Sequence, residues 1–148
     1  MKTKRMILVI IMLAGIFGCK KECPKPLVFD NFSIVYQVKS IPANYSKVVT
    51  IDNSGLLQIT YDIQRFHDES SYHLSVSDIA LVKEKLGDVT TMNFEKSYIG
   101  DEVIYDLPTT LIKYSVDGKK DSTSMYNVNQ NQLPHRLATL LATIGNLV

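Results

Sequence analysis

The sequence has little excess of either charge. Sixteen Lys and Arg face fifteen Asp and Glu, so the formal net charge is +1 with the histidines neutral. Proteins that bind nucleic acid need a basic surface to neutralise phosphates. The composition therefore argues against nucleic acid as a partner, and about 130 residues beyond the N-terminal segment suit a single folded domain.

The sequence also lacks a hydrophobic run long enough to cross a membrane as a helix. The apolar stretch near the N-terminus, 6–17, has twelve residues, whereas a spanning helix needs about 20. Lys2, Lys4 and Arg5 precede it without any acid. A positive start followed by a short apolar stretch is typical of a signal peptide, which we predict at 1–18. Its removal would leave 13 Lys and Arg against 15 acids, a net charge of −2.

The apolar stretch ends in Ile16-Phe17-Gly18-Cys19, which resembles the lipobox of bacterial lipoproteins, although a small residue is usual where Phe17 stands. The resemblance implies cleavage before Cys19, a lipid such as palmitate on that cysteine, and attachment to a membrane of the cell envelope. We expect the outer membrane. The alternatives are an ordinary secreted protein cut nearby and an uncleaved anchor.

Cysteine is scarce, with Cys19 and Cys23 the only two. If lipid occupies Cys19, Cys23 has no partner for an internal disulfide, so the fold must rely on its core. Two prolines among polar residues make 19–26 an extended tether, and the domain is expected at 27–148. We interpret Cys23 as an incidental thiol, because it lies in this tether without a nearby histidine.

Motifs for catalysis are absent: there is no Gly-x-Ser-x-Gly elbow and no glycine-rich phosphate loop. His67, Asp68, Glu69 and His73 form the densest group of metal-ligand types, and zinc uses such side chains. Their spacing matches no metal motif, so we interpret them as part of a polar loop. No cofactor is predicted.

Two further candidates are acidic or titratable. Asp101, Glu102 and Asp106 could gather around calcium or act as paired carboxylates, but the ligand pattern of an EF-hand is missing. His135 lies near the start of a predicted helix, where a positive charge is disfavoured, so a neutral surface histidine is expected.

Alternation of apolar and polar residues predicts strands. Turn residues predict hairpins at Asp52-Asn53-Ser54-Gly55 and Asp117-Gly118. The returning strand 119–128 is polar, which favours a sheet edge guarded by Lys119 and Lys120. The predicted strands are 32–39, 47–51, 57–64, 110–116 and 119–128.

Two helices are predicted. The first begins at Ser77 as N-cap, carries an apolar stripe (Ile79, Val82, Leu86) and stops at Gly87. The second has Pro134 near its first turn and an apolar face formed by Leu133, Leu137, Leu140, Leu141 and Ile144.

These patterns predict an α+β fold: an antiparallel sheet of about five strands built from β-hairpins, with both helices packed on one face, in the order strand, hairpin, helix, hairpin, helix. Residues 65–75 are expected to form a polar loop. Residues 88–107 are too long for a plain loop in so small a domain, so they hold either a missed strand or a functional loop.

The C-terminal half is similar to an uncharacterised domain family found in bacterial lipoproteins, through Tyr98, Asp106-Leu107-Pro108-Thr109, the Asp117-Gly118 hairpin and Tyr126. The family's usual cysteine-containing motif is missing in front of Phe32. The resemblance implies a fold and no activity.

The sequence thus predicts a non-catalytic binding or interaction module, anchored to the membrane by lipid and facing a protein partner in the envelope. The partner surface would include the polar strand positions Gln58, Thr60, Lys113 and Ser115. The alternatives are a small hydrolase or metal-dependent enzyme built on His67, Asp68, His73 and the acidic segment 101–106, and a protein inhibitor.

Overall fold

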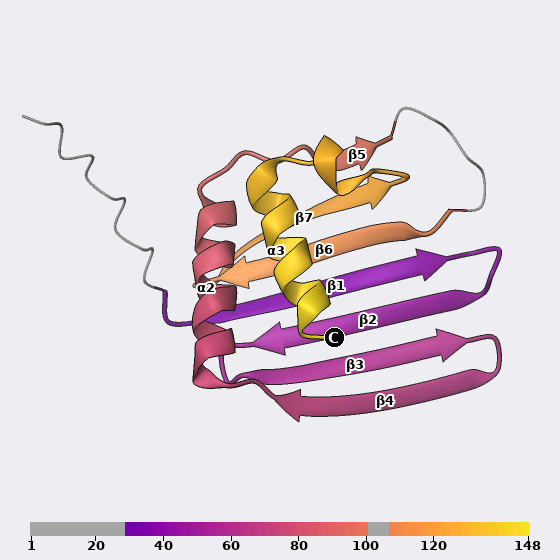
Figure 1. Cartoon of the computed structure of the whole chain (residues 1–148), viewed down its shortest axis with the longest axis horizontal. Coiled ribbons are helices and arrows are strands. Elements are labelled where there is room, and N and C mark those ends of the chain that lie inside the picture. The colour runs from indigo at the N-terminus through magenta and orange to yellow at the C-terminus, as the bar shows by residue number, and fades with distance from the viewer. Residues whose placement is uncertain (1–28, 101–106) are drawn as a thin grey trace, which may run out of the picture.

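The computed structural model describes residues 29–100 and 107–148. The predicted signal peptide (1–18), the tether (19–26) with Cys19 and Cys23, and the acidic candidates Asp101, Glu102 and Asp106 lie outside these residues. The described chain is an α+β fold in which one seven-stranded sheet carries two helices (Figure 1). The α+β class is therefore confirmed.

The strand order across the sheet is β4-β3-β2-β1-β6-β7-β5. All neighbouring strands run antiparallel except β5 and β7, which are parallel, so the sheet is mixed. The strands are β1 (Phe32–Ser40), β2 (Tyr45–Asp52), β3 (Leu56–Ile63), β4 (Phe66–His73), β5 (Ser97–Ile99), β6 (Thr109–Val116) and β7 (Lys119–Tyr126).

One face of the sheet provides most of the core. The register aligns Ile34 of β1 with Ile51 and Tyr114, and it aligns Ile51 with Leu57. All four of these side chains are buried. So are Val49, Ile59, Ile112 and Thr123 of the next row, in which Tyr36 is partly buried. Because side chains alternate across a strand, the residues between them point to the opposite face.

The two helices cover this apolar face. Helix α2 (Val76–Thr90) buries Val82, Leu86 and Val89, and helix α3 (His135–Asn146) buries Leu137, Leu140 and Ile144 in the same core. Figure 1 shows both helices on the same side of the sheet, and they also contact each other. A short 3₁₀ turn, η1 (Gln130–Gln132), precedes α3. The described residues contain no helix with the length and apolar character to cross a membrane.

The predicted number of strands, about five, is wrong, because two strands lack the alternation of apolar and polar residues on which the prediction rests. Residues 65–75, predicted as a polar loop, contain the eight-residue strand β4, in which no residue is buried. The strand expected somewhere in 88–107 is β5, three residues long. β7 is not the outermost strand, because β5 pairs with its far end at residues 124–126. Beside Lys119 and Lys120, no strand of the described residues pairs with the outer side of β7.

The limits of the first helix also differ from the prediction. The N-cap is Ser75, whose side chain accepts a hydrogen bond from the Asp78 backbone N–H, so the helix begins before Ser77. Gly87 does not stop the helix, which continues to Thr90. The additional turn places Val89 in the core, fully buried, and this burial outweighs the low helix propensity of glycine. For α3, Pro134 is the N-cap, close to its predicted position.

The start of the domain is fastened to the β6–β7 hairpin. The Asp117 carboxylate accepts hydrogen bonds from the backbone N–H groups of Asp30 and Asn31, at 3.2 and 3.0 Å. From α2, the Lys83 ammonium lies 5.7 and 5.8 Å from the ring centroids of Phe29 and Phe32. Such cation–π contacts are favourable at this range, so the chain enters the sheet at a fixed place.

The two hairpin glycines give a matched test of turn chemistry. Gly55 and Gly118 have φ of +81° and +83°, where a side chain costs about 1–2 kcal/mol. A Cβ on Gly118 would meet nothing, whereas one on Gly55 would lie 2.5 Å from Cδ1 of Ile79. We expect Gly55→Ala to lower the free energy of unfolding, measured by urea titration, by more than Gly118→Ala does. Equal losses would mean that Ile79 moves aside without cost.

Candidate functional site

The candidate site is the face of the sheet that points away from the helices, here called the open face. The register places Gln58, Thr60, Lys113 and Ser115 together on this face, as the proposed partner surface requires. Gln58 and Lys113 are exposed, and Thr60 and Ser115 are partly exposed. No residue at an open-face position of strands β1–β7 is buried.

Charge on the open face is divided between its two sides. Lys39, Lys113 and Lys120 lie on β1, β6 and β7, here called the basic half, and no acid occupies an open-face position of these three strands. Asp52, Asp62 and Glu69 lie on β2, β3 and β4, here called the acidic half, where no Lys or Arg takes such a position. Such a division of charge favours one orientation of a charged surface over the reverse orientation.

The basic half contains an open groove of about 320 Å³. Two of its lysines come from the open face itself, and Lys96 comes from the segment in front of β5. That segment is fixed to β7, because the Glu95 carbonyl accepts a hydrogen bond from the Thr123 hydroxyl (2.8 Å) and the Lys96 carbonyl accepts one from the Ser124 N–H (3.2 Å). The main polar residues that line the groove are Ser33, Lys96, Lys113, Ser115, Lys120 and Ser122.

Tyr114 and Asp121 also line this groove, although they belong to the helix-side face. The Tyr114 hydroxyl donates to a carboxylate oxygen of Asp121 at 3.5 Å. Burial, followed by the negative charge of Asp121, raises the pKa of Tyr114 to about 12. The phenol therefore stays protonated at neutral pH and cannot serve as a general base or nucleophile there.

The acidic half contains the strongest exposed polar cluster among the described residues. His67 Nδ1 lies 2.5 Å from a carboxylate oxygen of Asp62, directly across from it on β3, and His67 Nε2 lies 3.2 Å from Glu69. All three side chains are more than half exposed. The cluster is thus an ion-pair network at the surface, and no cleft encloses these three side chains.

The structure does not bring the predicted metal ligands together. His67 and His73 stand at opposite ends of β4, about 20 Å apart at the rise of a strand, and Asp68 points to the other face. Within residues 29–100 and 107–148, no three His, Cys, Asp or Glu side chains are placed to hold a metal ion. His135 lies exposed at the first turn of α3, as predicted.

His67 should titrate at a higher pH than an isolated histidine. The hydrogen bond to Asp62, and then that to Glu69, raise its pKa above 6.5. The cluster therefore stabilises the fold below pH 6.5, and this contribution disappears as the pH rises through the folded-state pKa. In an NMR titration of the ring protons, we expect Asp62→Asn to lower the pKa of His67 more than Glu69→Gln does. An unchanged pKa in Asp62→Asn would contradict the hydrogen bond.

Sequence reasoning found part of the basic half and missed the rest. The alternation of β6 predicts that Lys113 and Ser115 share a face. The polar composition of 119–128 instead predicts a sheet edge for Lys120. Lys96 precedes β5, which is too short at three residues to show a periodic pattern. Alternation along β7 is enough to predict the direction of the Lys120 side chain, since Lys120, Ser122 and Ser124 lie on the same face of that strand.

Comparisons with known proteins do not supply a function. No protein-family model matches the chain, and no curated protein is similar to it in sequence. The resemblances to bacterial lipoproteins and to their domain of unknown function therefore stay predictions, and the open face with its two charged halves is the basis for the function proposed next.

Proposed function

We propose that this protein is a non-catalytic binding module, held on the cell envelope by lipid on Cys19, which binds a protein partner through the open face. One observation carries the proposal: a polar sheet face with none of the described helices over it. The central strands of this face present hydroxyl, amide and ammonium groups, which can hydrogen-bond to a partner surface. Catalysis by such groups would require a nucleophile and a base close together.

The charge division indicates what kind of partner surface fits. An acidic region would lie against the basic half, where Lys39, Lys113 and Lys120 project and Lys96 closes the groove. A region carrying Lys or Arg would lie against the acidic half. Exposed charges of this kind raise the rate of association and set the orientation, more than they raise the final affinity.

The proposed anchor is compatible with such a role. Phe29, the first described residue, follows Cys19 by ten positions along the chain, and ten fully extended positions span at most about 35 Å. The domain would therefore stay close to the membrane surface and meet partners in the same membrane or in the adjacent layer. The outer membrane remains our preferred location, on the sequence features of the signal peptide and lipobox alone.

Reversal of charge on the open face tests the proposal. We expect chemical cross-linking in intact cells, followed by purification of the full chain, to recover a reproducible partner. Lys113→Glu with Lys120→Glu should reduce its recovery roughly tenfold or more, because the variant repels the acidic region that the lysines attract. High salt during cross-linking should also reduce the amount of partner recovered with the wild-type chain, because salt screens the same charges.

Lys119→Glu is the matched control. Lys119 neighbours Lys120 on β7 and is also exposed, but its side chain points to the helix-side face. The control should retain the partner. Absence of any reproducible partner for the wild type, or equal loss in both variants, would refute binding through the open face.

A further inference from the structure

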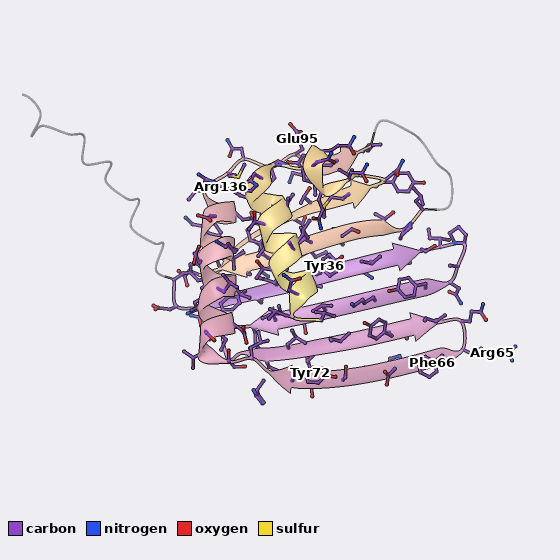
Figure 2. All side chains as sticks on the ribbon, viewed as in Figure 1. Tyr36, Arg65, Phe66, Tyr72, Glu95 and Arg136 are labelled. Carbon is purple, nitrogen blue, oxygen red and sulfur yellow. The ribbon has the colours of Figure 1, made fainter. Side chains whose placement is uncertain are left out.

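The free edge of the sheet at β4 has features that most sheet edges avoid. It is eight residues long, it follows the full length of β3, and it contains neither Pro nor Lys, the residues that usually prevent further pairing. The opposite edge is β5, with three residues. Phe66 and Tyr72, near the two ends of β4, are 62% and 57% exposed (Figure 2).

The sequence of β4 is complementary to itself in one antiparallel register. With Glu69 at the centre of a two-fold axis normal to the sheet, Phe66 lies opposite Tyr72 of the second copy, and Tyr72 lies opposite Phe66 of the second copy. Both side chains are on the helix-side face of their own sheet, so they meet on the same side. Asp68 then lies opposite Ser70, and His67 opposite Ser71, so six of the seven cross-strand pairs join an aromatic ring to a ring or a charged group to a hydroxyl.

We propose that two copies of this chain pair through β4, in antiparallel register about Glu69, to form a dimer with one continuous sheet. The symmetry is isologous, because the same strand supplies both sides of the contact. The backbone N–H and C=O groups that β4 turns away from β3 would provide ladder hydrogen bonds, as in other cases of strand addition. The two aromatic pairs, flanked by the exposed Ile63, make the contact specific to this strand.

The central pair, Glu69 opposite Glu69, opposes association. Like charges directly across a sheet destabilise it, but each Glu69 contacts His67 of its own strand at 3.2 Å, which partly compensates its charge when His67 is protonated. Two carboxylates contact His67: Asp62, which lies opposite it on β3, and Glu69 of its own strand. We therefore expect Glu69→Gln to strengthen the dimer several-fold while the domain still folds, since Glu69 is exposed.

Disulfide trapping tests the register in the full chain. Residues 69 of the two copies would have Cα atoms about 4.5–5.5 Å apart, within the range that a disulfide spans. In a Cys23→Ala background, Glu69→Cys expressed in cells and treated with a mild oxidant should yield a covalent dimer on a non-reducing gel. The background alone, and Gln58→Cys on the open face of β3, should not.

A substitution that removes the aromatic pairs gives the second measurement. In sedimentation equilibrium of the full chain in detergent, we expect wild type to dimerise, Glu69→Gln to dimerise more tightly, and Phe66→Ser to weaken dimerisation by about tenfold. Phe66 is exposed, so this variant should fold; circular dichroism checks that it does. A wild type that stays monomeric, a disulfide at Ser70→Cys in place of Glu69→Cys, or trapping of a different protein at β4 would each overturn the proposal.

Discussion

Replacing Leu140 with alanine should lower the free energy of unfolding by about 2–5 kcal/mol, the range found when a buried leucine leaves a cavity. Leu140 lies in the middle of α3, is 0% exposed, and belongs to the core that joins both helices to the sheet. The loss has two parts: the transfer energy of the removed methyl groups, and the empty volume that the surrounding side chains cannot fully fill. A fall of this size is a large share of the stability of a small domain.

Urea denaturation followed by circular dichroism measures this loss, and Leu81→Ala is the control. Leu81 is also a helical leucine, in α2, but it is 41% exposed, so its removal should cost well under half as much. The slope of the free energy against urea should not change, since both variants expose the same surface on unfolding. Similar losses in the two variants would mean that α3 does not pack on the sheet in solution.

The central strands and α3 were predictable because each of them buries the side chains on one face and exposes those on the other. In β1 and β3 most apolar residues alternate with polar ones, and in α3 they recur at helical spacing. The hairpins at Gly55 and Gly118 were predictable for a different reason: their positive φ demands a particular residue type. Both signals are local, so a single sequence carries them.

β4 was not predictable by the same means. Every residue of β4 except the partly buried Ser70 is exposed, and β4 is the end strand of the sheet that the described residues form. Because neither face of β4 is buried, its sequence does not alternate between apolar and polar residues, and its composition is that of a loop. The segment is a strand because it pairs with β3, and this pairing depends on the tertiary structure and not on the local sequence pattern.

The candidate site was half predictable for a related reason. Alternation identifies which residues of a strand point outward, so Gln58, Thr60, Lys113 and Ser115 could be assigned to one surface. Alternation does not reveal which strands are neighbours. The gathering of lysines on β1, β6 and β7, and of acids on β2, β3 and β4, follows from the strand order, in which β1 stands at the centre between β2 and β6.

A second large effect concerns Cys19, which is outside the described residues and carries the proposed lipid. Each methylene placed in the bilayer contributes about 0.8 kcal/mol, so one acyl chain binds reversibly while two or three hold a protein permanently. The thiol of Cys19 is the only group of the proposed lipobox that can bear the diacylglyceryl chains. Loss of that one sulfur should therefore remove the acyl anchor completely, although it changes no residue of the folded domain.

We expect cells fed radioactive palmitate to label the wild-type chain and Cys23→Ala, but not Cys19→Ala. Cys23 is the matched control, because it is a cysteine only four residues away in the same predicted tether. Mass spectrometry of the labelled chain should place its N-terminus at Cys19, with the mass of the acyl groups added. Label on Cys19→Ala, or an unlabelled wild type, would contradict lipid attachment at this residue; the charge-reversal test on Lys113 and Lys120 would still decide whether the open face binds a partner.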